Sequence, residues 1–252
     1  MPLPTSRRSS TIRTAAVTVA ALLGSLVVTA GCARDVDGVA HPATTAVKIL
    51  PTADEMMSSV GNPLSTFGFQ PFIGGVEILP DGYRTEAEAS PIDCVAVTDT
   101  AMRVVYEPMA VLEAARQSYF NWDEGVGVSG ADAAVVRLAR TVDAEGTFGD
   151  LAKRWQSCDG KTVIKHLRGA NDSDLVAVIS DVAVEGRIVS ATVRTREGPY
   201  SPTSTYQRAL GTRGDAIVEA SLGLTSSGLR DTDSHAAANT VKVMLDKVAD
   251  VG

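Results

Sequence analysis

The feature that most constrains the fold is an alternation of apolar and polar residues through the second half of the chain. Five β-rich segments share it: 161–167, 175–184, 187–196, 206–210 and 216–222. Only Glu185-Gly186 separates the second segment from the third, and a two-residue connection that contains glycine is typical of a β-hairpin. The last two segments flank residues 211–215 in the same manner. This region therefore predicts a meander of antiparallel strands.

Helical patterns and two further strand patterns precede and follow this meander. Residues 53–60 predict a short helix, with Thr52 and Glu55 spaced as a capping box. Further helices are predicted at 99–106, at 143–158 and from 234 onward, and further strands at 114–122 and 133–141. Together these elements indicate a single domain of the α+β class, in which an antiparallel sheet packs with helices.

Residues 61–91 are rich in proline and glycine and are predicted to form a loop. Phe67, Phe69 and Phe72 lie within this loop. We expect the three rings to pin the loop to the core, because clusters of exposed aromatic rings are costly. An exposed binding patch is the alternative.

The first 32 residues have the composition of an export signal. Arg7, Arg8 and Arg13 precede an apolar run at 15–30, and no acidic residue occurs before Cys32. This order is typical of a secretory signal peptide. An uncleaved membrane anchor is the alternative, because about 20 apolar residues can span a bilayer, but small residues dilute this run. In either case the remainder of the chain is expected to work outside the membrane.

The end of this segment, Thr29-Ala30-Gly31-Cys32, resembles the lipobox of bacterial lipoproteins, although Thr29 stands where that motif usually carries an aliphatic residue. The resemblance implies that a signal peptide, residues 1–31, is removed. It also implies that Cys32 is acylated and anchors the chain to the outer face of the cell membrane. Residues 32–52 lack periodicity and are predicted to form a flexible tether, which leaves a domain at 53–252.

Lipidation of Cys32 would leave Cys94 and Cys158 as the remaining cysteines of a chain that has three. An exported domain folds in an oxidising compartment, so the pair predicts one disulfide. Two unrelated buried thiols are the alternative.

Charge excludes one class of partner. Removal of the three arginines of the signal leaves 20 basic against 30 acidic residues. Nucleic acid is therefore not expected as a partner, because its phosphates require a basic surface. Anionic lipid headgroups are equally unsuited to hold the domain, so the acyl chains must supply the affinity for the membrane.

Several motifs of the domain resemble one family. They are Ser90-Pro91-Ile92-Asp93-Cys94, Asp99-Thr100-Ala101, Tyr106, Trp155-Gln156-Ser157-Cys158 and Tyr206-Gln207-Arg208-Ala209-Leu210-Gly211. Together they resemble the PknH-like extracellular domain, a sensor module of some mycobacterial serine/threonine kinases that also occurs in stand-alone lipoproteins. The resemblance covers most of residues 53–252 and implies an α+β fold whose concave sheet face accepts an unidentified ligand. Family members often hold two disulfides. This chain has the cysteines of the first disulfide, and the positions of the second pair are not cysteine.

A dinucleotide site is not expected despite a matching glycine pattern. Gly125, Gly127 and Gly130 satisfy G-x-G-x-x-G, but Asp123 and Glu124 directly precede it and would repel a pyrophosphate. A strand rather than a helix is predicted after it. We therefore interpret this segment as a glycine-rich turn.

The sequence also lacks a recognisable hydrolase or metal motif. Ser129 is followed by Gly130-Ala131, so the Gly-x-Ser-x-Gly spacing fails. His41 falls in the tether and His235 opens the last helix, which leaves His166 as the histidine best placed to face a cleft. No histidine pair has ligand spacing, so no metal and no cofactor are expected.

These observations favour binding over catalysis. Aromatic and arginine side chains make the strongest anchors in binding sites. The candidates are Tyr106, Trp122, Arg137, His166, Tyr200 and Tyr206. We expect a non-catalytic envelope lipoprotein whose domain senses an envelope small molecule or a protein. An envelope hydrolase with an unrecognised carboxylate pair, or a purely structural role, is the alternative.

Overall fold

The computed structural model describes residues 45–167 and 173–251. Within these ranges, nine strands form an antiparallel sheet of order β1-β3-β4-β9-β8-β7-β6-β5-β2. The strands are β1 Phe72–Gly74, β2 Ala89–Ser90, β3 Val111–Phe120, β4 Val128–Leu138, β5 Thr162–His166, β6 Asp174–Glu185, β7 Ile188–Glu197, β8 Ser204–Arg213 and β9 Ala216–Leu224. The predicted α+β class and the antiparallel meander are therefore confirmed.

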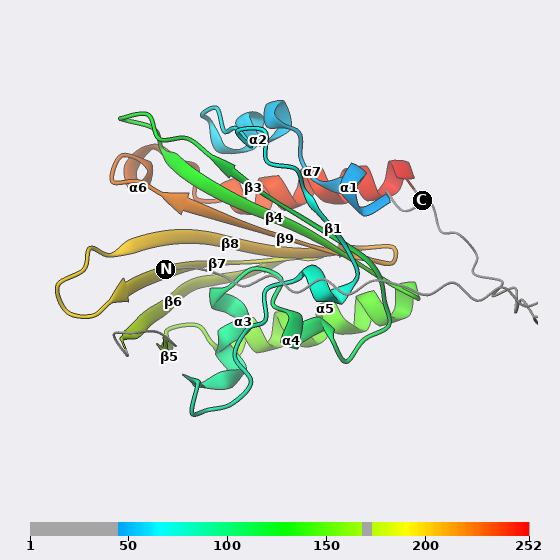
Figure 1. Cartoon of the computed structure of the whole chain (residues 1–252), viewed down its shortest axis with the longest axis horizontal. Coiled ribbons are helices and arrows are strands. Elements are labelled where there is room, and N and C mark those ends of the chain that lie inside the picture. The colour runs from blue at the N-terminus through cyan, green and yellow to red at the C-terminus, as the bar shows by residue number, and fades with distance from the viewer. Residues whose placement is uncertain (1–44, 168–172, 252) are drawn as a thin grey trace, which may run out of the picture. The chain divides into compact units, whose positions relative to one another are not determined.

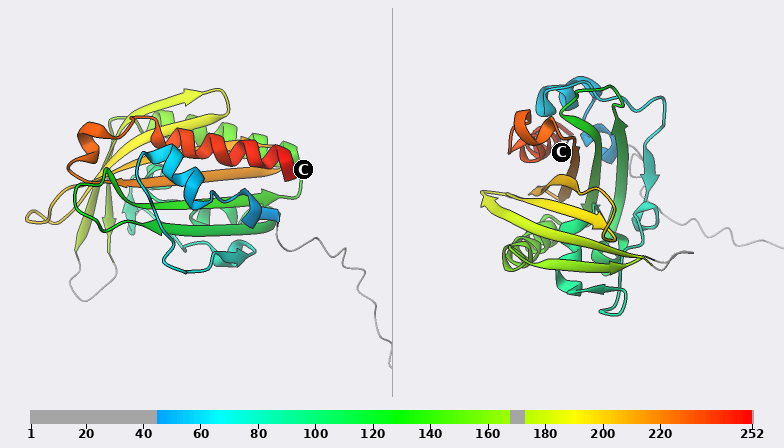
Figure 2. Two further views of the ribbon diagram at one scale, coloured as in Figure 1. Left: turned by 90° about the horizontal axis from the view of Figure 1, so that it is seen from above. Right: turned by 90° about the vertical axis from the view of Figure 1, so that its left-hand side faces the viewer.

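The helices lie on both faces of this sheet. They are α1 Thr45–Ile49, α2 Ala53–Val60, α3 Val95–Thr98, α4 Arg103–Tyr106, α5 Thr141–Ser157, α6 Gly228–Asp231 and α7 Ala236–Val251, with short 3-10 turns η1 Val76–Ile78 and η2 Ile92–Cys94. The two long helices, α5 and α7, pack against opposite faces, as Figures 1 and 2 show.

Each face has its own apolar core. On one face, α5 contributes Phe148, Leu151 and Trp155, which pack with buried residues of α3 and of the strands. On the other face, α7 joins α1 and α2 in a core that includes Val241 and Met244. We refer to these as the α5 face and the α7 face. A sheet covered on both faces explains why many strand residues on either side are buried.

The domain begins earlier than its predicted boundary at residue 53. Residues 1–44, including Cys32 and most of the predicted tether, lie outside the described residues. The rest of that tether is not a flexible segment, because α1 spans Thr45–Ile49 and buries Ala46 and Ile49 against the α7 face. So short a helix leaves no detectable period in the sequence. The predicted capping box is confirmed, since Thr52 accepts a hydrogen bond from the Glu55 amide and the Glu55 carboxylate accepts one from Thr52.

The single helix predicted at 99–106 is wrong. Helix α3 ends at Thr98, and α4 begins at Arg103. Between them, Ala101 has a φ of 49°, and its amide donates a hydrogen bond to the Glu219 carboxylate at 3.0 Å. A residue in the left-handed region interrupts a helix. A side chain far away in the sequence therefore shapes this segment.

Gly211 lies within β8 and not in the turn predicted at 211–215. The turn is confined to Gly214 and Asp215, because β8 continues to Arg213. A Cβ atom on Gly211 would lie 2.7 Å from a methyl carbon of Val241 and 3.0 Å from one of Leu245. The glycine therefore allows α7 to approach the sheet closely.

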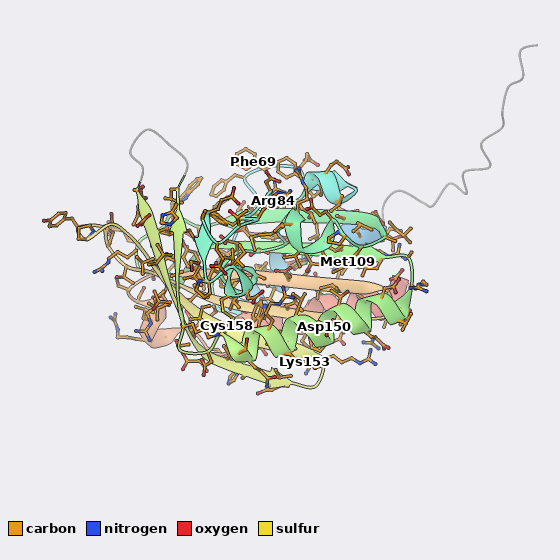
Figure 3. All side chains as sticks on the ribbon, turned by 90° about the horizontal axis from the view of Figure 1, so that it is seen from below. Phe69, Arg84, Met109, Asp150, Lys153 and Cys158 are labelled. Atoms are coloured by element: carbon orange, nitrogen blue, oxygen red, sulfur yellow. A yellow bond between two sulfur atoms is a disulfide. The ribbon has the colours of Figure 1, made fainter. Side chains whose placement is uncertain are left out.

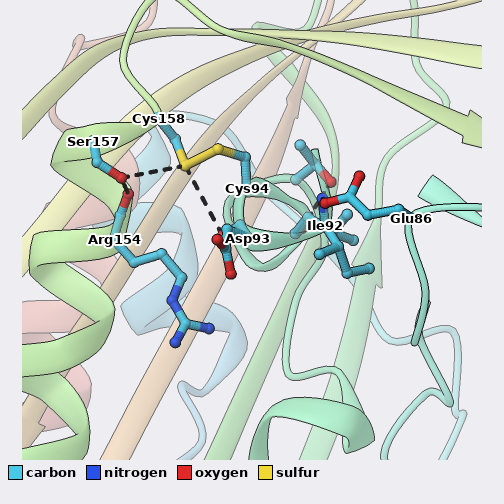
Figure 4. Close-up of a disulfide and its surroundings, with 9 residues drawn as sticks. Glu86, Ile92, Asp93, Cys94, Arg154, Ser157 and Cys158 are labelled. Carbon is cyan, nitrogen blue, oxygen red and sulfur yellow. Dashed lines mark hydrogen bonds between the residues drawn. A yellow bond between two sulfur atoms is a disulfide. The ribbon is translucent and has the colours of Figure 1, made fainter. Parts of the chain in front are cut away.

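The predicted disulfide is present. Cys94 and Cys158 are bonded, and their Cα atoms are 5.6 Å apart. Cys158 follows the end of α5, where Figure 3 labels it, and Figure 4 shows its bond to Cys94 at the end of η2. Both cysteines are fully buried. The bond therefore fixes α5 to the segment that leads into α3.

Candidate functional site

Part of the α5 face is left open by the helices. The register of β3, β4, β9 and β8 places two neighbouring rows of residues there. The first row is Ser118, Asp132, Ser221 and Arg208, and the second is Phe120, Gly130, Gly223 and Tyr206. The first row is polar throughout, whereas the second has an aromatic ring at each end and no side chain between them. The two rows thus form a floor with different chemistry along its length.

Two adjoining cavities lie over these rows. The inner cavity has a volume of about 330 Å³, and the outer cavity has a volume of about 310 Å³. Asp132, Tyr206 and Ser221 line both cavities, so the two lie side by side over the same part of the sheet. We call the combined hollow the sheet groove. Its size is within the range of pockets that hold small molecules.

Lys165 of β5 provides a buried cation in the inner cavity. Its side chain is 1% exposed, and its Nζ lies 2.5 Å from a carboxylate oxygen of Asp99, which is 38% exposed. Burial lowers the pKa of Lys165, while the charge of Asp99 opposes that decrease. An ammonium group has three protons to donate, so protons remain for a ligand after the bond to Asp99.

A buried ionic cluster borders the floor on the same face of the sheet, because Glu219 has the same strand phase as Ser221 and Tyr106 belongs to the core of the α5 face. Glu219 of β9 lies 2.9 Å from the guanidinium of Arg208 and accepts hydrogen bonds from the Tyr106 hydroxyl and the Ala101 amide. Arg208 also donates to the Val97 carbonyl at 3.2 Å. Burial raises the pKa of Glu219, and the charge of Arg208 opposes that rise. The cluster joins α3, α4, β8 and β9 beside the floor of the groove.

Aromatic rings gather at the open end of the groove. Trp122 lies in the outer cavity and is 71% exposed. Phe67 stacks on it with ring centroids 4.4 Å apart, and the Phe120 ring lies 5.9 Å away. The expectation that Phe67, Phe69 and Phe72 pin the loop to the core is therefore wrong, since all three are exposed. Phe67 has a φ of 50°, a left-handed conformation that costs energy in an aromatic residue.

The structure brings two of the six predicted binding residues together. Tyr206 and Trp122 both line the outer cavity. Tyr106 is fully buried in the ionic cluster beside the groove, so it is not accessible to a ligand.

The other three predicted residues lie outside the groove. Arg137 pairs with Asp215 at 2.7 Å and lines a separate cavity beside α1. His166 is exposed and contacts Asp174 at 2.6 Å. Tyr200 is 99% exposed in the connection between β7 and β8. None of them contributes to the two cavities described above.

Sequence reasoning missed Lys165, Asp99 and Asp132. Lys165 could have been found, because it occupies the same alternating phase as the buried Val163 in a predicted strand. A charged residue at a core-facing position suggests a special role. Asp99 and Asp132 carry no comparable signal, since neither stands out from the many acidic residues of the chain.

We expect Lys165→Met to change the free energy of unfolding at pH 7 by less than about 1 kcal/mol, because methionine fills a similar volume and Asp99 stays partly hydrated. The folded-state pKa of Lys165 lies below its unfolded value, so the unfolded chain binds more protons between those two values. Relative to the variant, wild-type stability should therefore rise as the pH increases toward about 10.4. Urea unfolding at pH 7 and at pH 10 measures the difference. A difference that does not change with pH would contradict a folded-state pKa of Lys165 below its unfolded value.

The model of the PknH-like extracellular domain family matches residues 41–247. The chain belongs to this family. The match begins before α1, in agreement with the early start of the domain, and the resemblance stated from the motifs is confirmed. The family is a non-catalytic extracellular sensor domain, and membership indicates an exported domain. In the described part of the chain, no helix has the length and apolarity needed to cross a membrane.

The fold is shared with a solved member. The crystal structure of the extracellular domain of PknH from Mycobacterium tuberculosis superposes with a TM-score of 0.66 at 16% sequence identity. The alignment covers 83% of this chain and 97% of that domain. At this identity the likeness establishes the fold alone. A search of curated proteins found no match.

Proposed function

We propose that this protein is a cell-envelope lipoprotein whose PknH-like domain is a receptor that binds a ligand in the sheet groove. One observation carries the proposal: Lys165 is nearly completely buried, yet it lines a cavity that opens along the sheet. Burying an ammonium group costs free energy, so its position facing a hollow is explained best by recognition. The aromatic residues Tyr206 and Trp122 line the continuation of the same hollow.

The side chains around the groove support binding better than catalysis. Ser118 donates a hydrogen bond to Asp132 at 2.5 Å, but a serine nucleophile also requires a base that can accept its proton at neutral pH. His166 contacts Asp174, and among the described residues no hydroxyl or thiol side chain makes a hydrogen bond to its ring. The described residues also contain no cluster of three side chains that could hold a metal ion.

Membrane anchoring through Cys32 is the second part of the proposal. Full-length protein with Cys32→Ala is expected to incorporate no fatty acid when cells are grown with an alkyne-labelled palmitate, whereas the wild-type protein incorporates it. Thr29→Leu introduces the aliphatic residue that lipoboxes usually carry and should leave the incorporation of fatty acid unchanged. Mass spectrometry that finds Met1 still attached, or no fatty acid on Cys32, would exclude lipoprotein processing.

Ligand binding is tested with Gly130→Leu, which fills the outer cavity. A Cβ atom at Gly130 has no neighbour closer than 3.7 Å, and its φ is not positive, so the side chain fits without backbone strain. The mature lipoprotein, purified in detergent, would be screened by thermal shift against lipids, glycan fragments and small metabolites. A ligand of the groove stabilises the wild-type protein and not the variant. Turnover of an ester or a glycoside would contradict a receptor role, and a screen in which Gly130→Leu abolishes no hit would contradict binding in the groove.

A further inference from the structure

The arrangement of the second row indicates the shape of the ligand. Phe120 and Tyr206 stand at its two ends, and Gly130 and Gly223 lie between them. The missing side chains leave a floor of sheet backbone beside aromatic rings. Gly130 is not required by packing, because a Cβ atom there would meet only ordinary van der Waals neighbours. The open floor is therefore a feature of the site and not of the fold.

Polar groups lie directly beside this aromatic end. Asp132 and Ser221 occupy the neighbouring row and line both cavities. Ser129 and Ser204 line the outer cavity as well. The carboxylate of Asp132 is exposed and has only Ser118 as a hydrogen-bond donor among the described residues. A ligand on this floor therefore meets apolar ring faces on one side and hydroxyl or carboxylate groups on the other.

The charges that line the groove balance. Asp99 and Asp132 are acidic, whereas Lys165 and Arg116 are basic. Lys165 is paired with Asp99, and the Arg116 guanidinium lies over the Phe72 ring at 4.2 Å from its centroid. An anionic ligand would be repelled by the carboxylate of Asp132, which no cation of the groove neutralises. A cationic ligand would be repelled by Lys165 and Arg116. The groove therefore favours a molecule without net charge.

The aromatic end is also fixed in position before any ligand arrives. Phe67 stacks on Trp122 from a loop whose backbone is strained at Phe67. Strain of this kind persists where the surrounding structure holds it, and it gathers at functional sites. In the same loop, the Ser65 Oγ accepts a hydrogen bond from the Phe67 amide at 3.0 Å. A fixed platform lowers the conformational entropy lost on binding.

We propose that the sheet groove binds a neutral oligosaccharide, whose ring faces pack on Trp122, Phe120 and Tyr206 and whose hydroxyls contact Asp132 and Ser221. Sugar rings combine apolar C–H faces with hydroxyls that donate and accept, which is the combination this surface offers. The two cavities in series suit a linear chain of more than one sugar. This inference rests on the proposed receptor function and specifies its ligand class.

Trp122 supplies a direct readout. The chain has two tryptophans, and Trp155 is fully buried. A ligand-induced change in the tryptophan fluorescence therefore reports on Trp122, the tryptophan that a ligand can contact. The probes are maltotetraose, cellotetraose, mannotetraose and chitotetraose as neutral oligosaccharides. Tetragalacturonate is the anionic counterpart and fully deacetylated chitotetraose is the cationic one. The full mature lipoprotein is titrated in a detergent that carries no sugar headgroup.

We expect at least one neutral tetrasaccharide to shift the emission saturably, and the two charged ones to bind at least about tenfold more weakly. Trp122→Ala removes the fluorescent reporter, so binding to this variant is measured by thermal shift. The affinity should be about tenfold weaker, in keeping with the loss of one aromatic contact. Asp132→Ala should weaken it by about tenfold to a hundredfold, because an ionised acceptor is lost. Tyr200→Ala removes an even more exposed ring outside the groove and should leave the affinity unchanged.

Three results would overturn the inference. The first is tighter binding of the anionic or the cationic tetrasaccharide, and the second is equal loss of affinity in Tyr200→Ala and Trp122→Ala. The third is the absence of binding by every neutral tetrasaccharide. In each case the receptor proposal still stands if compounds of another class stabilise the wild-type protein and not Gly130→Leu. If no compound does so, both proposals fail.

Discussion

Glu219→Gln is expected to lower the free energy of unfolding by about 3–5 kcal/mol, the largest effect we predict for a single substitution. The substitution removes the charge that neutralises Arg208, and both side chains are buried. Tyr106 and Ala101 donate to different oxygens of the Glu219 carboxylate, and glutamine has a single acceptor oxygen, so it can accept from only one of them. The loss therefore combines the uncompensated charge of Arg208 with one lost hydrogen bond. Urea unfolding of the two proteins at pH 7 measures the effect.

The double variant Glu219→Gln with Arg208→Met separates charge from packing. It removes both charges, so most of the lost stability should return. Lys165→Met is a matched comparison, because it breaks an ion pair whose cation is equally buried but whose carboxylate is partly exposed. A loss below about 1 kcal/mol for Glu219→Gln, or a larger loss for Lys165→Met, would contradict our account of the cluster.

Replacement of both Cys94 and Cys158 by alanine is expected to lower the free energy of unfolding by about 4 kcal/mol. The two residues are 64 positions apart, and the crosslink reduces the conformational entropy of the unfolded chain in proportion to the logarithm of the loop length. The loop contains β3, β4 and α5, so its loss also loosens the attachment of α5 to η2. Unfolding by urea without reductant measures the difference.

The free-thiol content tests the same bond independently. Exported protein denatured without reductant should show no titratable thiol from this pair, and two thiols would show that the bond does not form in the cell. The Cys94→Ala single variant should lose about as much stability as the double variant, because either change opens the loop. A loss confined to the double variant would point to packing of the buried sulfur atoms rather than to the crosslink.

Local patterns predicted most of the elements. The hairpin of β6 and β7 was predicted from alternation and from Glu185-Gly186, and the observed strands pair through that turn. Helix α5 begins at Thr141, close to the predicted start at 143, and the cysteine pair forms the predicted bond. Each of these features depends on neighbouring residues or on composition. The segment at 99–102 failed because the Glu219 carboxylate, from another strand, determines its backbone.

The candidate site was less predictable for a related reason. Lys165 and Asp99 are 66 residues apart, and the polar row draws its members from four strands. No spacing in the chain connects them. The prediction for the aromatic loop was wrong because it used only the general free-energy cost of exposing aromatic rings to water. It could not foresee that Phe67 and Trp122 stack on each other, which reduces that cost.

The sequence by itself determined the antiparallel α+β fold, the disulfide and membership of an extracellular family, because periodicity, cysteine number and short motifs are properties of contiguous residues. Only the tertiary structure decided that Ser118, Asp132, Ser221 and Arg208 lie in one row and that Lys165 faces a hollow. Strand register and the limited reach of α5 over the sheet determine both outcomes. They result from packing between distant segments, which the linear order of residues does not encode in any local signal.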